Sequence, residues 1–351
     1  MNDVTTPQAT SPVPKLARHP VDFRGNASEY FGIWIVNVVL TILTLGIYSA
    51  WAKVRRKRYF YGNTVLDGHS FEYHALPITI LKGRLVAVGI IIVFNLLAEF
   101  FPIVAVVVFV AYLFALPFVI NMGLRFNARM TSYRNVRFNF VGNYWQAFIA
   151  FILMPLAALL TLGLLVPVMS QMTTTYIAKG YRYGTAPFAA KPLIRAFYGV
   201  FLNAFLFAVI VALVVAGTAA AILFASGSMI AGAVVIISIV LYLTVIPAGI
   251  FYSAGTRNVT YNALVLDDRH RFESNLKPLR YVWIIVSNFL VTIATFGLMR
   301  AWAAIRSTRY IAAHTTVLMS GTADDFVGEV ESDAGVTAAE YMDLEGFDLG
   351  F

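Results

Sequence analysis

A short turn motif that recurs three times inside apolar sequence places the strongest constraint on the fold. Thr44-Leu45-Gly46, Thr161-Leu162-Gly163 and Thr295-Phe296-Gly297 each follow an apolar run. A tyrosine stands fifteen residues after each threonine, at Tyr59, Tyr176 and Tyr310. Recurrence at this scale inside hydrophobic sequence indicates a polytopic membrane protein built from internal repeats.

The three copies align over long stretches. Adding 117 to the numbering places the first copy on the second, and adding 251 places it on the third. Ten identities fall within the twenty-three positions from Asn37 to Tyr59 and their counterparts from Asn288 to Tyr310. We therefore expect three parallel membrane repeats at 21–137, 138–262 and 263–318, the last one truncated. They are flanked by a disordered N-terminus, 1–20, and an acidic cytoplasmic tail, 319–351, that is expected to be disordered.

The composition indicates lipid around much of the surface. The chain has 351 residues, of which 59% are hydrophobic and 13% charged, whereas soluble domains carry about 25% charged residues. No charged side chain occurs from Phe100 to Leu124, from Phe138 to Ala178 or from Ala196 to Thr256. A spanning helix needs about 20 apolar residues, so these stretches predict an all-α polytopic membrane protein.

Two topologies compete for each repeat. In one, a single span is followed by an amphipathic surface helix; in the other, the Thr-x-Gly is the tip of a helical hairpin. The hairpins put every basic cluster on one face, whereas single spans would put Lys179 to Arg195 outside. Because positive charge favours the cytoplasmic side, we prefer hairpins, with several crossings and both termini cytoplasmic. Glycine suits such a tip because it tolerates positive φ; the structural turns are Gly46, Gly163 and Gly297.

Short β elements are expected between the helices, on the cytoplasmic side. Asp67-Gly68 separates Thr64-Val65-Leu66 from Phe71-Glu72-Tyr73, which is a hairpin signal. Asp267-Asp268 separates two similar runs. These runs predict small cytoplasmic β elements.

The residues around and after the first turn read Leu43-Thr44-Leu45-Gly46-Ile47-Tyr48, Ala50-Trp51-Ala52-Lys53-Val54-Arg55, Arg58-Tyr59 and Phe71-Glu72-Tyr73. They resemble the YjgN-type family of bacterial inner-membrane proteins. The resemblance covers about Phe23 to Ala313. It implies a multi-pass protein of the bacterial cytoplasmic (inner) membrane, and it implies neither an activity nor catalytic residues.

Two arginine faces recur at matching positions. Trp51, Arg55 and Arg58 share a helical face, and so do Trp302, Arg306 and Arg309. They are candidates to bind an anion or a lipid headgroup. The alternative is a positive anchor with snorkelling side chains and tryptophans at the membrane interface.

Four asparagines fall within predicted spans. Buried amides of this kind join helices by hydrogen bonds or line a polar path. The candidates are Asn37, Asn288, Asn95 and Asn203.

Several kinds of chemistry have no signal in the sequence. The chain has no cysteine, and its five histidines do not pair at a metal-ligand spacing on a predicted helix. No phosphate-binding glycine loop or nucleophile elbow occurs. We therefore expect no enzyme, no cofactor and no metal site, and no nucleic-acid partner.

Two functional hypotheses remain. The first is a transporter or channel for a small anionic solute or lipid, with anionic membrane lipids as partners. The second is a non-transporting scaffold whose tail recruits a protein. The tail carries nine acids and no basic residue, and without it the net charge of +8 becomes +17.

Overall fold

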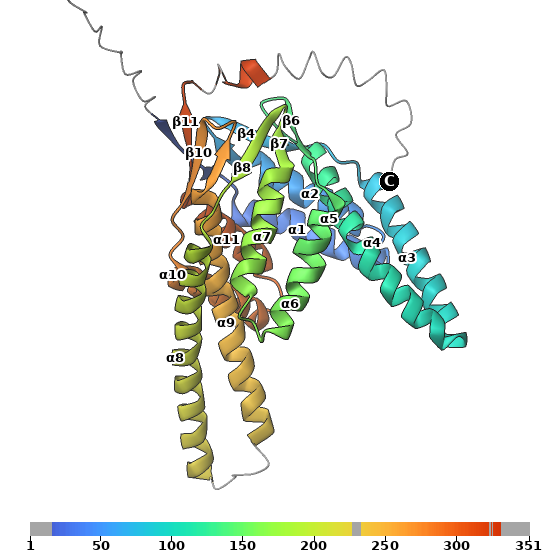
Figure 1. Ribbon diagram of the computed structural model, residues 1–351, viewed down its shortest axis with the longest axis vertical. Coiled ribbons are helices and arrows are strands. Elements are labelled where there is room, and N and C mark those ends of the chain that lie inside the picture. Colours follow the sequence, from blue (N-terminus) through green and yellow to red (C-terminus); the bar gives the residue numbers. More distant parts are fainter. Residues whose placement is uncertain (1–15, 227–232, 323, 325, 331–351) are drawn as a thin grey trace, which may run out of the picture.

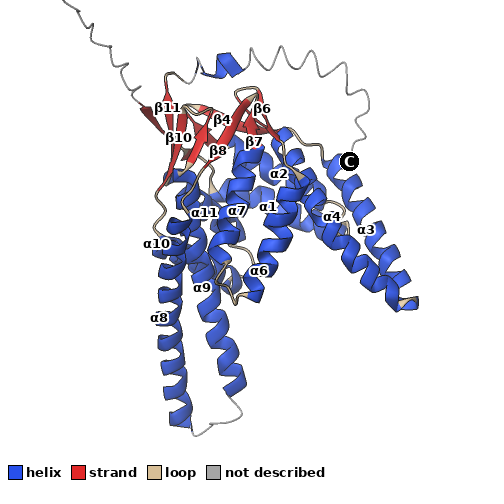
Figure 2. Cartoon of the chain, viewed as in Figure 1, coloured by secondary structure: helices blue, strands red, loops and turns tan. Residues whose placement is uncertain are grey.

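The fold combines a ring of strands with pairs of helices. The computed structural model describes residues 16–226, 233–322, 324 and 326–330. Figure 2 shows the strands gathered at one end, with the helices extending away from them. Within the described residues, the element order alternates a pair of helices with a pair of strands.

The helices fall into two length classes. The short pairs are α1 (Ala27–Leu43) with α2 (Ser49–Gly62), and α10 (Pro278–Ala294) with α11 (Arg300–Ala313). A third short pair joins α5 (Tyr144–Phe148), the π-turn Ile149–Leu153 and α6 (Met154–Leu160) to α7 (Val166–Gly180). The long pairs are α3 (Pro77–Phe100) with α4 (Pro102–Arg129), and α8 (Ile194–Ser226) with α9 (Ala233–Asn262). The two long pairs diverge (Figure 1).

Each Thr-x-Gly motif connects the two helices of a short pair. Gly46, Gly163 and Gly297 have φ of 93°, 92° and 92°, and the residue before each has φ of 50°. The threonine hydroxyl of each motif accepts a hydrogen bond from the backbone N–H four residues later, at 2.9, 3.3 and 3.2 Å. The apolar residue at each tip is almost fully exposed: Leu45 96%, Leu162 96% and Phe296 98%.

The tyrosine after each motif ties the two helices of its pair together at the opposite end. The Tyr59 hydroxyl accepts from the Asn26 N–H (2.8 Å), and that of Tyr310 accepts from the Lys277 N–H (3.1 Å). The Tyr176 hydroxyl donates to the Asn143 carbonyl (3.3 Å). Each partner is the residue directly before the first helix of the pair, so the recurring tyrosine has a structural role.

The strands form one antiparallel sheet. In the described chain the order of its 11 strands is β1-β11-β10-β9-β8-β7-β6-β5-β4-β3-β2. Only Val21 separates β1 from β2, at the two ends of this order, so the sheet returns on itself as a nearly closed barrel. The strands are β1 (Leu16–Pro20), β2 (Asp22–Phe23), β3 (Thr64–Leu66), β4 (His69–Tyr73), β5 (Thr131–Tyr133), β6 (Val136–Phe140), β7 (Tyr181–Tyr183), β8 (Ala186–Ala190), β9 (Leu264–Leu266), β10 (His270–Ser274) and β11 (Thr315–Ser320).

The barrel overturns the prediction of an all-α protein of three parallel repeats with small β elements. Each hairpin is only three plus five residues long, so it looks minor in the sequence. The helix pairs bring successive hairpins edge to edge: Phe71 pairs with Tyr133, Phe138 with Tyr183, and Phe188 with Leu266. The pairing between hairpins is what turns isolated fragments into a closed sheet, and no local pattern encodes it.

Segments near both ends of the described residues contribute to the barrel. Residues 16–20, which the sequence assigned to a disordered N-terminus, pair with β11 in the register Leu16 to Ser320. Met319 and Ser320, assigned to the tail, lie in β11. The predicted disorder of residues 1–15 and 331–351 falls outside the described residues.

Candidate functional site: the barrel cavity

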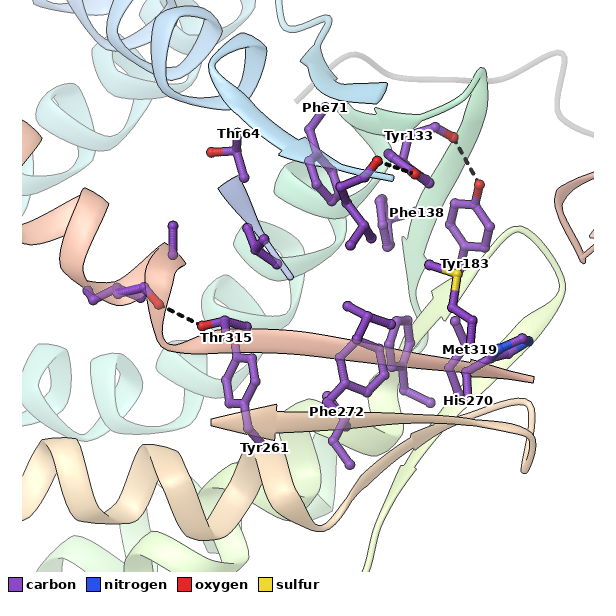
Figure 3. A pocket seen from close by; sticks show the side chains of 18 of the residues that line it. Thr64, Phe71, Tyr133, Phe138, Tyr183, Tyr261, His270, Phe272, Thr315 and Met319 are labelled. Carbon is purple, nitrogen blue, oxygen red and sulfur yellow. Dashed lines mark hydrogen bonds between the residues drawn. The ribbon is translucent and has the colours of Figure 1, made fainter. Parts of the chain in front are cut away.

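The barrel encloses an apolar cavity of about 420 Å³. Strand residues alternate between the two faces of a sheet, and here the inward positions are mostly aromatic or aliphatic. Figure 3 shows these side chains converging on a common space. Its strand-borne lining comprises Thr64, Leu66, Phe71, Tyr133, Phe138, Tyr183, Phe188, Leu264, Leu266, His270, Phe272, Thr315, Val317 and Met319.

A ring of phenylalanines surrounds the middle of this cavity. Phe71, Phe138, Phe188 and Phe272 each occupy the central position of a five-residue strand. Phe188 and Phe272 lie 5.8 Å apart, and Phe71 and Phe138 lie 6.4 Å apart, between ring centroids. Val21, between β1 and β2, lines the cavity with them. The ring therefore has one small member.

Two tyrosines connect strands that are separated by one strand in the sheet: β5 with β3, and β7 with β5. The Tyr133 hydroxyl donates to the Leu66 carbonyl (2.8 Å), and the Tyr183 hydroxyl donates to the Tyr133 carbonyl (3.0 Å). Burial raises the pKa of Tyr133 to about 12. This phenol is therefore neutral at physiological pH and contributes no charge to the cavity.

The helix side of the cavity is more polar. Arg257 of α9 lines it and donates to the Ser274 and Thr315 hydroxyls at 2.6 and 2.9 Å. The Tyr261 ring lies 4.0 Å from the Arg257 guanidinium carbon. A second cavity of about 460 Å³ adjoins the first, since both are lined by Phe71, Phe138, Phe188, Tyr261 and Leu264. Asn127, Thr174 and Thr260 line this second space.

A short helical segment, residues 326–330, covers the opposite end of the barrel. We call it the tail helix. Phe326, Val327 and Val330 are buried in the same apolar cluster as Tyr133 and Tyr183. Figure 1 shows the segment above the hairpin turns. Two acidic residues hold it: Asp324 pairs with Arg134, and Glu329 pairs with Arg269 at 2.9 Å.

His270 lies directly under the tail helix. Its ring centroid is 4.1 Å from that of Phe326, and its Nδ1 accepts the Ser320 N–H at 3.3 Å. Its Nε2 is buried without a hydrogen-bond partner. Burial, followed by the charge of Arg269, lowers the pKa of His270 below its ordinary value.

The arginines singled out in the sequence lie outside the barrel, and two of them brace the backbone. Arg58 donates to the Tyr73 and Ala75 carbonyls at 3.2 and 3.3 Å, and Arg309 donates to the Gly25 carbonyl at 2.9 Å. These carbonyls lie at the end of β4 or within two residues after β4 or β2, and the Phe140 carbonyl at the end of β6 accepts in the same way from Arg125 at 3.3 Å. The arginines therefore brace the chain where it leaves the sheet.

The other two predicted arginines have polar side-chain partners. Arg55 donates to the Tyr48 hydroxyl at 3.0 Å. Arg306 donates to Ser287 Oγ (2.7 Å) and Asn288 Oδ1 (2.8 Å). Trp302 lies beneath the Arg306 guanidinium at 5.1 Å, and Trp51 stacks on Tyr48 at 6.0 Å. Thus neither tryptophan enters the barrel cavity.

The four predicted asparagines do not form one path. Asn37 and Asn288 are buried in the two short pairs at the ends of the chain. Asn95 and Asn203 are exposed on the long helices α3 and α8, and the Asn95 amide donates to the Ile91 carbonyl of its own helix. Asn37 and Asn288 thus lie inside the protein, whereas Asn95 and Asn203 lie on its surface.

The long helices are suited to a membrane. Among the described residues, three helices are long and apolar enough to cross one: Pro77–Phe100, Ile103–Arg129 and Ile194–Ala221. In the most apolar 18-residue window of each, only 6% of the residues are buried inside the protein. No cluster of three or more metal-ligating side chains occurs in the part of the chain that the structure describes.

Sequence reasoning missed the barrel site almost entirely. The recurring signal was a phenylalanine in the middle of each five-residue strand, three to five residues after a turn. Asp67-Gly68 and Asp267-Asp268 correctly predicted two hairpins. Arg134-Asn135 has the same positive φ but is not a typical turn sequence. The segment covering the barrel was assigned to the acidic tail, whose suggested partner was another protein and not the barrel of the same chain.

Comparison with known proteins agrees with the resemblance found in the sequence. The family described as "Bacterial protein of unknown function (DUF898)" matches residues 18–344. The inner membrane protein YjgN of Salmonella typhimurium is 26% identical, over 85% of this chain and 88% of its own. That of Escherichia coli O157:H7 is 38% identical over 39% of this chain and 35% of its own. No solved structure matches significantly. The YjgN-type resemblance is confirmed, and the chain is a membrane protein that belongs to the DUF898 family of bacterial proteins of unknown function.

Proposed function

We propose that this protein binds a membrane amphiphile with its apolar chain in the barrel cavity and transfers it between the bilayer and the face covered by the tail helix. The observation that carries the proposal is the aromatic lining of the 420 Å³ cavity in the barrel of a membrane protein. Ligand pockets of roughly 300–1,000 Å³ with mostly apolar walls and a few polar groups are typical of small-molecule sites.

The lining favours a lipid over a small anionic solute. A free anion would lose its hydration among Phe71, Phe138, Phe188 and Phe272, which offer it no hydrogen-bond donor. An acyl chain gains free energy in the same place, at about 0.8 kcal/mol for each buried CH₂ group. The apolar wall therefore supports the lipid version of a transporter.

The polar end of the cavity gives the amphiphile an orientation. Arg257 lies at the helix side and has no carboxylate within 4 Å in the described residues. Its guanidinium can meet a phosphate or carboxylate headgroup while the chain extends toward the phenylalanine ring.

We further propose that the barrel and both termini lie in the cytoplasm of a multi-pass protein. Basic residues in and beside the strands support this orientation, including Arg137, Arg182, Lys191 and Arg271. The chain has no native cysteine, so exposed positions such as Asn135→Cys and Thr185→Cys can be introduced singly. An impermeant thiol reagent added to intact cells should leave both unlabelled; labelling of either would reverse the orientation.

The acidic tail is the basis of the alternative, a scaffold that recruits a partner. The first part of the tail, Asp324 and residues 326–330, is engaged by the barrel of the same chain. This cis contact supports a role in covering the cavity and leaves less of the tail for a partner.

The experiment for lipid binding enlarges the small member of the phenylalanine ring, Val21. Val21→Phe adds a ring to the cavity. Val265→Phe makes the same change on the outer face of β9, because Val265 lies between Leu264 and Leu266, which line the cavity. We expect Val21→Phe to weaken binding of a fluorescent fatty acid at least tenfold and Val265→Phe to leave it unchanged. Equal binding by both folded variants would refute an occupied barrel.

A further inference from the structure

A second pocket, outside the barrel, gathers three cations. It has a volume of about 380 Å³ and lies between α1, α2 and α11. Lys53 and Arg56 come from α2, and Arg300 comes from the first residue of α11. None of the three has a carboxylate within 4 Å in the described chain. Three positive charges thus share one pocket, and none of the acidic side chains that the structure describes neutralises them.

The cations belong to helices that are distant in the sequence. Shortly before α1 in the chain, β1 lies beside β11 and β2 lies beside β3. α1 therefore packs on both α2 and α11. The guanidinium groups of Arg56 and Arg300 act electrostatically on the phenol of Tyr30, which lines the same pocket. Closure of the barrel therefore builds the pocket, and no single helix carries it.

An unsatisfied polar atom also lies at this pocket. Asn37 lines it, its side chain is only 7% exposed, and its Oδ1 has no hydrogen-bond partner. The matching residue Asn288 has its Oδ1 satisfied by Arg306 at 2.8 Å. A buried acceptor without a donor is costly, so a ligand that brings a donor would relieve it.

The remaining walls are apolar. Trp34, Val38 and Ile42 of α1 line the side that leads toward the exposed hairpin tip at Leu45. The pocket thus offers cations for a phosphate, an amide oxygen for a hydroxyl or ammonium donor, and an apolar wall for a chain.

We propose that this pocket binds a phosphate group that carries a neighbouring hydrogen-bond donor, as in a glycerophospholipid headgroup. The phosphate lies among Lys53, Arg56 and Arg300, and the donor meets Asn37 Oδ1. The site is separate from the barrel cavity, and it stands whether or not that cavity holds an acyl chain.

The test compares two variants that remove the same charge. Lys53→Gln/Arg56→Gln/Arg300→Gln removes the pocket cations, and Arg137→Gln/Lys191→Gln/Arg271→Gln removes three exposed cations of the barrel. Native mass spectrometry of the full-length protein would quantify retained phosphatidylglycerol and phosphatidylcholine, and calorimetry would measure inorganic phosphate. Each Lys or Arg near an anionic headgroup contributes modestly, so three should change affinity on the order of 100-fold.

Each outcome decides the proposal. Selective loss of phosphatidylglycerol in the pocket variant identifies a lipid headgroup as the ligand. Equal loss of inorganic phosphate binding in that variant identifies a free phosphate at the same site. Undiminished retention in the pocket variant, or the same loss in the barrel variant, overturns the site. Should the triple variant fail to fold, Arg300→Gln alone is expected to lower the affinity about fivefold, and it should fold because Arg300 is exposed.

Discussion

Val330 of the tail helix lies directly against Gly184 in the turn between β7 and β8. A Cβ atom placed on Gly184 would come within 2.4 Å of Val330 Cγ1. Gly184 also has a φ of 54°. The absence of a side chain in this turn is therefore a condition for the tail helix to cover the barrel.

Gly184→Ala should displace the tail helix. We expect a reporter cysteine at Val327, which is buried in the docked state, to react with a maleimide at least ten times faster in this background. The matched control is Gly68→Ala, in the turn between β3 and β4. Gly68 also has positive φ, 79°, but nothing lies within 4 Å of its Cβ position. Similar rates in the two backgrounds would show that backbone strain, and not the contact with Val330, controls exposure.

Acid should loosen the same contact through His270. Its folded pKa is lowered, so the neutral ring is favoured when the helix is docked, and protonation favours release. The contribution is complete above the ordinary histidine value of about 6.5 and declines as the pH falls below it. Protonation at Nδ1 would also remove the acceptor for the Ser320 N–H.

The rate of labelling at Val327→Cys, corrected for thiolate content, should therefore rise as the pH falls from 7.5 to 5.5. His270→Phe keeps an aromatic ring against Phe326 and should flatten this profile. A profile that is unchanged by the substitution would assign the pH dependence to another group.

Asp324 adds a second acid dependence at lower pH. The Arg134 guanidinium, through a hydrogen bond and its charge, holds the pKa of this carboxyl below its ordinary 3.8. Its contribution to docking is therefore present above about pH 4 and is lost as the pH falls through the lowered value. Asp324→Asn should weaken docking at pH 7 and remove the loss at low pH, as measured by the protection of Val327→Cys. Asp22→Asn changes an acid that pairs with Arg24 away from the tail helix and should alter neither.

Arg309→Gln should destabilise the fold more than Arg55→Gln. Arg309 satisfies the Gly25 carbonyl at the point where β2 leads into α1, whereas the hydrogen bond that Arg55 makes within the described residues goes to the Tyr48 hydroxyl of its own helix pair. Hydrogen bonds from charged groups contribute about 1.5–3 kcal/mol when buried, and exposure of Arg309 reduces this to about 1 kcal/mol. Thermal unfolding in detergent would compare the two, and an equal loss would remove the bracing role.

The sequence predicted local features well and global closure poorly. Thr44-Leu45-Gly46 and its counterparts form turns between helices because glycine tolerates the positive φ that such a turn requires. Asp67-Gly68 marks a real hairpin for the same kind of local reason. The ring of Phe71, Phe138, Phe188 and Phe272 depends on strands up to 200 residues apart, and nothing local specifies that they meet.

The arginine faces show a second limit of pattern reading. Arg58 and Arg309 occupy matching positions, which suggested a shared ligand. In the structure they brace the carbonyls of Tyr73, Ala75 and Gly25. Arg56 and Arg300 do not match one another in the alignment, yet they meet in one pocket. The recurring arginines, Arg58 and Arg309, therefore have a structural role. The charges of Arg56 and Arg300 are brought together by tertiary packing, which the sequence pattern does not reveal.

The most direct test of the account is to identify what occupies the barrel in native membranes. A benzophenone amino acid replaces Phe188, which points into the cavity, and in a matched protein it replaces Val265 on the neighbouring strand. After illumination of whole cells, mass spectrometry of the purified protein should show a lipid adduct at position 188 and little at position 265. Crosslinks at 188 that lead only to the protein itself, with no lipid mass, would contradict a lipid-binding barrel.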